Sequence, residues 1–360
     1  MTVLHATEAA SVYLSTAARV ADVTVADIDE ALYVRRSVVK QIAMRRTVFA
    51  FPRDLLPAAL GSASPRVAAP EFAKLTRDVV AAGLAIDGAA WLRTAEAAIL
   101  EFLRDRPDAS AQEIREQVPA VQGTVVNAPG TKWSRETHVA PLLLTVLGCE
   151  GKIVRGHNRG HWRISKPAWT PTQSWLGGPV DALESATGYA ELVRRWLATF
   201  GPGTERDIVW WLGSTKTAVR RALTDVEAVQ VRTDRDGVGW VLPDDVEPEP
   251  DVAPWTALLP ALDPTTMGWK ERDFYLAADD VPFIFDSAGN GGSTAWWNGR
   301  IVGCWLQDPD GTVQVIERRP LPADARAALT IEAERLTDWL DGVVVSSPYM
   351  AQQRRSAKLP

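Results

Sequence analysis

The chain has 360 residues, of which 46% are hydrophobic and 23% are charged, and its 45 acidic and 39 basic residues give a net charge of −6. This composition is typical of a soluble globular protein, and the length exceeds what one hydrophobic core usually serves, so two to four domains are expected. No run of about 18 apolar residues and no signal segment is present, which argues against membrane insertion and secretion and favours the cytoplasm.

The two cysteines and the net charge exclude further classes of protein. Cys149 and Cys304 are the only cysteines, and they lie far apart in the chain, so we expect buried packing residues rather than a disulfide framework. Their spacing supplies no zinc site, and we predict no metal and no cofactor. The acidic total opposes a general DNA-coating protein, so any affinity for DNA must come from locally clustered bases.

A helix is predicted over residues 8–19, and a first helix–helix–strand unit follows it. Thr24 and Asp27 resemble a capping box that opens a helix ending at Arg36. Ser37 opens a second predicted helix to Arg46, and residues 47–51 are strand-like before Pro52. This segment is the most basic of the chain, and ordinary solvated faces are the alternative to DNA contact for its bases. Its candidate DNA contacts are Arg35, Arg36, Lys40, Arg45 and Arg46.

A second unit spans residues 91–165. It comprises a long amphipathic helix (Trp91–Arg106), a short helix opened by the Ser110/Glu113 capping box, a helix from Ser134 to Cys149, and a basic hairpin. The predicted strands of this hairpin, residues 152–155 and 161–164, flank a tip over 156–160, in the manner of a wing. We expect its two histidines to contact phosphate rather than metal, because no ligand-spaced carboxylate or cysteine accompanies them. Its candidate DNA contacts are Lys152, Arg155, His157, Arg159 and His161.

Residues 204–242 form the most complete unit. Thr204 and Asp207 open a short helix to Leu212, Gly213-Ser214 breaks it, and a second helix runs over 214–226. Strand-like runs over 229–233 and 238–242 are joined by Arg235-Asp236-Gly237, a tight-turn signal. A basic helix followed by a hairpin is how winged modules address DNA. The candidate contacts on this helix are Lys216, Arg220 and Arg221.

The last third of the chain has a different pattern of predicted elements. Asn298-Gly299 and Asp310-Gly311 are hairpin signals, and they join strand-like runs over 293–297, 300–306 and 312–317 into a β-meander. A helix over 322–340 and a closing strand over 343–345 complete it. An acidic, proline-bearing stretch over 244–254 separates this region from the third unit.

Three non-identical copies of one pattern predict tandem modules rather than one large fold. We therefore predict an α+β chain with three tandem winged helix-turn-helix domains, followed by a small β-rich, barrel-like domain. The predicted boundaries are 1–85 (a first winged helix, short at its N-terminus), 86–170, 186–246 and 252–346. Unrelated small helical subdomains are the alternative to the tandem repeat.

This order of modules, with Leu258–Pro264 leading into Trp269–Arg272, resembles the bacterial winged-helix DNA glycosylases related to AlkZ and YcaQ. Members of that family excise alkylated bases or unhook interstrand crosslinks. Their signature, Gln-Φ-Gln or Gln-Φ-Asp, matches His5-Ala6-Thr7 in position, while the residue types differ. The family usually carries a further helix before this signature, so the resemblance implies that the first winged helix is truncated or that the true start lies upstream.

Base excision passes through an oxocarbenium-like sugar, so an enzyme must position a water and stabilise positive charge after reaching the damaged nucleotide. At the signature position, His5 can orient or deprotonate that water and Thr7 can hold it by its hydroxyl. The two converge only on an extended backbone, where residues i and i+2 share one side. The alternatives are that Thr7 caps the helix that follows and that His5 is simply exposed.

Two classes of function remain open from the sequence. The first is a monofunctional DNA glycosylase that hydrolyses N-glycosidic bonds of alkylated or crosslinked bases. The second is a non-catalytic DNA-binding protein, either a regulator or a damage sensor. In both, the partner is double-stranded and preferentially damaged DNA in the nucleoid, with no obligate protein partner. The pairs Trp210-Trp211 and Trp296-Trp297 can stack on bases, but at least one tryptophan of each pair is expected in the core.

Overall fold

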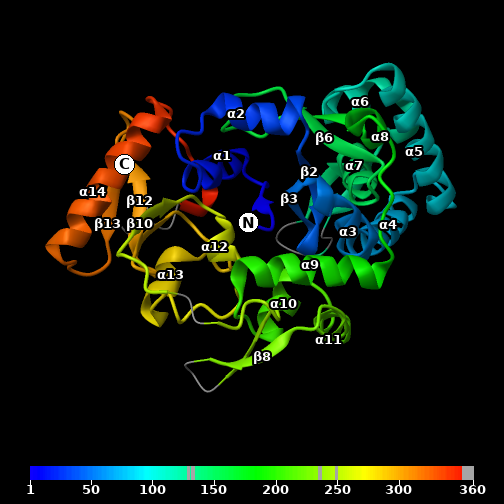
Figure 1. Ribbon diagram of the computed structural model, residues 1–360. Coiled ribbons are helices and arrows are strands. Elements are labelled where there is room, and N and C mark those ends of the chain that lie inside the picture. Colours follow the sequence, from blue (N-terminus) through cyan, green and yellow to red (C-terminus); the bar gives the residue numbers. More distant parts are fainter. Residues whose placement is uncertain (128–129, 131–133, 234–236, 248–249, 351–360) are drawn as a thin grey trace.

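The computed structural model describes residues 1–127, 130, 134–233, 237–247 and 250–350, which have a mixed α/β fold with a β-rich C-terminal sheet (Figure 1). A three-stranded sheet of order β1-β3-β2 lies near the N-terminus in sequence, and a four-stranded sheet of order β10-β11-β12-β13 lies in the last third. Three two-stranded hairpins lie between them along the chain. None of the described helices has the length and apolar character that a membrane span needs.

The N-terminal region contains a sheet where a second helix was predicted. Its elements are β1 (Leu4–His5), α1 (Ala9–Ala17), α2 (Val25–Asp29), β2 (Val38–Ala43), β3 (Thr47–Pro52), α3 (Leu56–Gly61) and α4 (Ala63–Ala81). The capping box at Thr24 and Asp27 is confirmed. The predicted helix from Ser37 to Arg46 is wrong, since β2 pairs with β3 along its whole length. Its β-branched residues Val38, Val39 and Ile42 fit a half-buried pleated surface better than a helix.

In the second region the long amphipathic helix and the short helix after it are confirmed, and two boundaries are corrected. Its elements are α5 (Gly88–Asp105), α6 (Ala111–Gln117), β4 (Thr124–Asn127), β5 (Arg135–His138), α7 (Val139–Cys149), β6 (Ile153–Asn158), β7 (Pro167–Pro171) and α8 (Thr172–Leu176). The Ser110/Glu113 capping box is present. The predicted helix from Ser134 begins instead at Val139, because that places Pro141 in the first turn, where its missing N–H has no partner to lose.

The return strand of the second hairpin was also misplaced. The prediction put it at residues 161–164, but β6 pairs with β7, at 167–171. Burial explains the difference, because residues 168–170 are buried whereas 161–166 are exposed or half-buried. The strand that packs into the core is the one that pairs.

The third region agrees with the sequence prediction. Its elements are α9 (Ser185–Phe200), α10 (Glu205–Leu212), α11 (Lys216–Asp225), β8 (Val229–Arg232) and β9 (Val238–Val241). The Thr204/Asp207 capping box is present, and Gly213 ends α10 in the left-handed conformation (φ 59°). The β8–β9 pairing is antiparallel, and residues 235 and 236 of its predicted turn lie outside the described residues.

The C-terminal region is the predicted meander with a helix packed on it. Its elements are β10 (Thr256–Leu259), α12 (Pro264–Met267), α13 (Val281–Ile284), β11 (Thr294–Trp297), β12 (Arg300–Gln307), β13 (Val313–Glu317) and α14 (Ala323–Leu340). The sheet is an open row of four strands, not a closed barrel. The predicted closing strand at 343–345 is wrong: the Gln307 side-chain amide bonds the carbonyl of Val343 (3.0 Å) and the N–H of Val345 (2.8 Å). A side chain thus takes the place of a strand neighbour.

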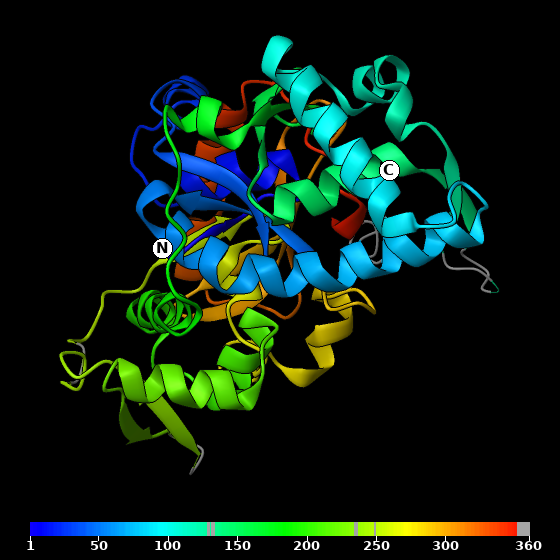
Figure 2. The same cartoon turned by 90° about the vertical axis from the view of Figure 1, so that its right-hand side faces the viewer.

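The first nineteen residues connect these regions: Figure 1 shows the N-terminus between α12 and β3, and Figure 2 shows that it lies toward one side of the molecule. The Thr2 hydroxyl donates to the carbonyl of Arg195 on α9 (2.7 Å), and Val3 is buried in the core that includes α9, α10 and α11. The Ser11 hydroxyl donates to the carbonyl of Ala261 (2.7 Å). The segment that carries His5 is therefore held from two sides.

A buried carboxylate completes this attachment. The Asp263 side chain is 0% exposed and accepts two bonds from the Arg19 guanidinium (2.7 and 2.8 Å) and one from the Ser15 hydroxyl (2.8 Å). Such charge-assisted, bidentate bonds are the strong ones in proteins. They fix the C-terminal end of α1 to the start of α12.

Asp263→Asn is expected to lower the free energy of unfolding by about 3 kcal/mol, because it removes one partner of a largely buried ion pair. Urea denaturation followed by circular dichroism measures this. The matched control is Asp279→Asn, at an exposed carboxylate with no ion pair among the described residues. Equal shifts in the two variants would show that Asp263 does not hold α1 in place.

Candidate active site and DNA interface

His5 lies in β1 opposite Phe49 of β3, so its own backbone is extended, whereas β1 ends at His5 and Thr7 lies in a bend. Its side chain is buried, with 7% exposed, and its ring stands edge-on to the Phe49 ring at 5.3 Å between centroids. The Nδ1 atom of His5 is buried and has no hydrogen-bond partner among the described residues. The alternative of an exposed terminal histidine is therefore wrong.

Burial, and then the nearby positive charge of Arg45, lower the pKa of His5 to about 3. The imidazole is consequently neutral at physiological pH. A neutral imidazole has one lone-pair nitrogen, which accepts a hydrogen bond. This side chain can hold a water but is a weak base toward it.

Thr7 and Glu8 follow at the end of β1. Thr7 is exposed and does not cap α1, which begins at Ala9 without a side-chain cap, so the capping alternative is wrong. Glu8 is half-buried, and burial raises the pKa of its carboxyl. Glu8 was not predicted from the sequence as a site residue, although it stands directly after the candidate signature and carries the negative charge that an oxocarbenium-like sugar needs.

Beside His5 the chain gathers cations around one aromatic ring. The guanidinium carbon of Arg45, between β2 and β3, lies 4.1 Å from the ring centroid of Trp210 on α10. The guanidinium carbon of Arg272, after α12, lies 5.2 Å from the same ring and 4.0 Å from the ring of Phe285. We call His5, Arg45, Trp210, Arg272 and Phe285 the central cluster. It joins the N-terminal sheet, α10 and the C-terminal region.

The sequence singled out His5, Arg45 and Trp210 but not Arg272. Trp210 is half-buried whereas Trp211 is in the core, and Trp296 is buried, as expected for one member of each pair. The signal for Arg272 was its place in the run Trp269–Arg272, followed by aromatic residues. Only the tertiary fold brings that run to Arg45.

Many of the basic side chains predicted to contact DNA form ion pairs with carboxylates. Each ion pair reduces the positive charge that the basic side chain presents to a phosphate. The pairs are Arg46 with Glu71 (3.1 Å), Lys152 with Glu96 and with Glu150 (2.7 Å), His157 with Asp108 (3.0 Å), Arg159 with Glu113 (2.5 Å), Arg220 with Glu205 (2.6 Å) and Arg221 with Asp225 (3.6 Å). Exposed surface pairs of this kind contribute little to stability and can open on binding.

The remaining predicted bases differ in accessibility. Arg36 bonds the carbonyl of Trp175 (2.5 Å), Lys40 donates to the Tyr33 hydroxyl (2.7 Å), and Arg155 lies 5.4 Å over the Trp169 ring. These three serve contacts inside the fold. Those that are exposed and form no ion pair within the described residues are Arg35, His161 and Lys216.

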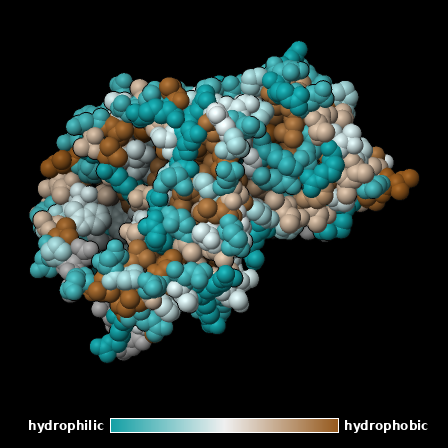
Figure 3. Space-filling view, turned by 45° about the vertical axis from the view of Figure 1, so that its right-hand side comes forward, coloured by the Kyte–Doolittle hydropathy of each residue, from teal (hydrophilic) through white to brown (hydrophobic). Residues whose placement is uncertain are grey.

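The two predicted DNA-contacting hairpins do not form one continuous patch. Figures 1 and 2 place α11 and the β8–β9 hairpin at one end of the molecule and α5, α6 and β6 toward the other. Figure 3 shows hydrophilic residues over much of one face, with hydrophobic ones in separate patches between them.

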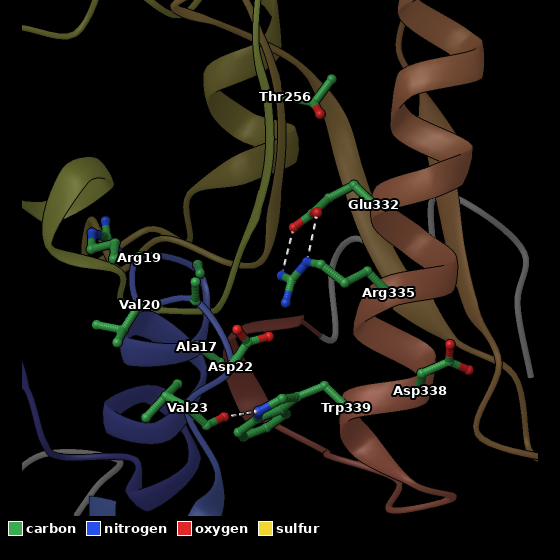
Figure 4. Close-up of a pocket in the computed structure, with 12 residues that line it drawn as sticks. Ala17, Arg19, Val20, Asp22, Val23, Thr256, Glu332, Arg335, Asp338 and Trp339 are labelled. Carbon is green, nitrogen blue, oxygen red and sulfur yellow. Dashed lines mark hydrogen bonds and ion pairs between the residues drawn. The ribbon is translucent and has the colours of Figure 1, made fainter. Parts of the chain in front are cut away.

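A groove of about 650 Å³ lies apart from the central cluster, between the end of α1 and α14 (Figure 4). Two contacts link its lining residues: Glu332 pairs with Arg335 (2.7 Å), and the Trp339 ring N–H donates to the carbonyl of Val23 (2.7 Å). None of the predicted catalytic or DNA-contacting residues lines it. Among the described residues, no group of three or more His, Cys, Asp or Glu is placed to hold a metal ion.

Comparison with known proteins identifies the family. A family model described as DNA glycosylase AlkZ-like matches residues 1–339. The chain belongs to the AlkZ-like DNA glycosylase family. The resemblance predicted from the sequence is confirmed.

The AlkZ-like fold is also found in a solved structure. The DNA glycosylase AlkZ of Streptomyces sahachiroi matches with a TM-score of 0.67 and 18% sequence identity, over 96% of this chain and 90% of that one. No match was found among curated proteins. As a member of the AlkZ-like family, this chain is a DNA-binding protein of the glycosylase type, and DNA is its substrate.

The low pKa of His5 makes stability depend on pH in a predictable direction. The unfolded chain takes up a proton on this side chain near pH 6.5, whereas the folded chain does so only near pH 3. Because the unfolded state binds more protons between these values, stability falls as pH falls below 6.5. Relative to His5→Gln, the unaltered protein should lose about 1 kcal/mol between pH 7 and 5.5.

Urea denaturation at the two pH values measures this difference, and His138→Gln, at an exposed histidine at the end of β5, is the control. Parallel pH curves for the unaltered protein and His5→Gln would contradict a neutral, buried His5.

Proposed function

We propose that this AlkZ-like protein excises alkylated or crosslinked bases from duplex DNA by hydrolysis of the N-glycosidic bond. Three winged helix units, over residues 1–85, 86–170 and 186–246, hold the damaged duplex beside the C-terminal domain of residues 252–346. The observation that carries the proposal is the buried His5 with its unpartnered Nδ1, at the position of the family signature. Damaged duplex in a cell belongs to the chromosome, so we expect the protein to associate with the nucleoid.

The proposed step uses His5 as an acceptor for water. The water oxygen bonds to the sugar C1′, the C1′–N bond breaks, and its electrons leave with the base. An alkylated base that is already cationic leaves as a neutral molecule and needs no proton from the enzyme. The proton of the water passes to His5 only when the new C1′–O bond has made it strongly acidic, because the pKa of His5 is about 3.

Two neighbours of His5 complete the proposed site. Thr7 is exposed, so its hydroxyl is accessible to a water or to the sugar. The Glu8 carboxylate stabilises the positive sugar electrostatically and is the final proton acceptor. Extrusion of the damaged nucleotide is needed to bring C1′ to these groups.

The activity is tested with a duplex that carries 7-methylguanine, scored for abasic sites. We expect His5→Ala and Glu8→Gln each to lower the single-turnover rate by about 10²- to 10⁴-fold, the usual contribution of a positioned acid–base group. His138→Ala is the matched control and should keep the full rate. Absence of excision by the unaltered protein, on this duplex and on a crosslinked one, would contradict hydrolysis.

DNA binding is tested on α11, where Lys216 is exposed without an ion pair and Arg220 must first leave Glu205. Lys216→Ala should weaken binding and lower the slope of log affinity against log salt by about 0.9. Arg220→Ala should have a smaller effect, because part of its charge is already neutralised. Fluorescence anisotropy from 50 to 200 mM salt measures both, with Arg326→Ala on α14 as the control.

If Lys216→Ala leaves affinity and salt slope as they are in the unaltered protein, α11 does not contact DNA phosphates.

A further inference from the structure

The two arginines of the central cluster are half-buried cations that form no salt bridge with a carboxylate among the described residues. Within the described residues, no carboxylate lies within 4.0 Å of Arg45 or Arg272, and the Nε atoms of both, with Nη2 of Arg272, are buried without a hydrogen-bond partner. Asp207 bonds the backbone N–H groups of Lys270 and Glu271 (2.7 and 2.8 Å) and the Thr204 hydroxyl (2.7 Å). Its carboxylate is therefore already hydrogen-bonded, and it acts on Arg272 only as a nearby negative charge that opposes the lowering of the pKa of Arg272.

Burial and mutual repulsion make this arrangement costly. Burial, and then the charge of Arg272, lower the pKa of Arg45 to about 10, and burial lowers the pKa of Arg272. Both remain charged at neutral pH. Unpaired buried charges and unmade hydrogen bonds destabilise a fold unless a partner arrives from outside.

The backbone also holds Arg45 in an uncommon conformation. Arg45 (φ 53°) and Arg46 (φ 60°) are consecutive residues in the left-handed region, which costs a non-glycine residue about 1–2 kcal/mol. Gly213 at the end of α10 packs against Arg45, and a Cβ atom there would lie 3.0 Å from the Cγ of Arg45. Strain that the surroundings maintain at one position is typical of a functional site.

We propose that Arg45 and Arg272 together bind one phosphodiester of the DNA strand that carries the excised base. Guanidinium groups match the oxygens of a phosphate, and two of them from separate segments hold it from two directions. Arg45 lies in the turn that joins β2 to β3, and His5 of β1 pairs with Phe49 of the same β3, so a phosphate held by Arg45 lies on the side of the sheet end that carries the candidate catalytic residue. The site thus positions the damaged nucleotide; it rests on the proposed function for the identity of the strand.

The test uses duplexes with a tetrahydrofuran abasic analogue, in which one phosphate at a time is replaced by an uncharged methylphosphonate. For the unaltered protein, replacement at one phosphate next to the analogue should lower affinity by about tenfold. The double variant Arg45→Gln with Arg272→Gln should bind more weakly overall and show no further loss at that phosphate, while its losses elsewhere persist. Arg326→Gln, at an exposed cation of α14 paired with Glu317, should reproduce the unaltered pattern.

Equal losses at every phosphate in the double variant and the unaltered protein would overturn the inference while leaving the proposed function intact. Should the double variant fail to fold, the single variants Arg45→Lys and Arg272→Lys replace it, because they keep the positive charge but lose the forked guanidinium group. In each of them, the loss of affinity caused by the methylphosphonate at that one phosphate should be at most half the loss in the unaltered protein. An unchanged pattern of losses overturns the inference.

A second arm separates the site from the proposed function. Inorganic phosphate at constant ionic strength, against chloride, should raise the melting temperature of the unaltered protein and not that of the double variant. That result supports an anion site even if no DNA binding is found. An absence of DNA binding would contradict the proposed function. Equal stabilisation of both proteins overturns the anion site.

Discussion

The buried contact between Asp263 and Arg19 is the constraint on which the candidate site depends. It fixes α1 to the C-terminal region, while Thr2 and Val3 fix the preceding residues to the helices of the third region. His5 lies between these two attachments, so its position follows from both. A short N-terminal strand, which would fray in isolation, is thereby held between two regions of the molecule.

The distribution of charged side chains also distinguishes the candidate site from the rest of the surface. The chain is acidic overall, and many of its surface bases are neutralised by nearby carboxylates, which limits indiscriminate attraction to DNA. The central cluster has the opposite character, with cations packed on aromatic rings. Cations that remain unpaired inside a fold are strongly felt by an approaching anion, because little solvent screens them. The two unpaired arginines of the central cluster therefore attract negative charge to the region of His5.

Short local motifs in the sequence were sufficient to predict many of the helices and hairpins. The three capping boxes at Thr24, Ser110 and Thr204 and the hairpin at Asn298-Gly299 were predicted and are present, because each depends only on nearby residues. The errors arose where tertiary packing decided: the strand β2, predicted as a helix, and β7, which was placed several residues too early.

The site was predicted only in part for the same reason. His5 and Arg45 were singled out from motif position and charge, but their proximity depends on the pairing of β1 with β3 and on the turn after β2. Arg272 is separated from them by more than two hundred residues, and no sequence pattern joins the two segments. Burial, which lowers the pKa of His5, is likewise a property of the whole fold rather than of the His-Ala-Thr motif.

The most direct measurement of the central claim is hydrogen–deuterium exchange of the full chain, with and without a duplex containing an abasic analogue. If the DNA strand docks at the central cluster, amides of residues 44–46, 213–216 and 270–274 should gain protection together on binding. Protection confined to residues 156–166 or to the groove between α1 and α14, with these segments unchanged, would contradict the account.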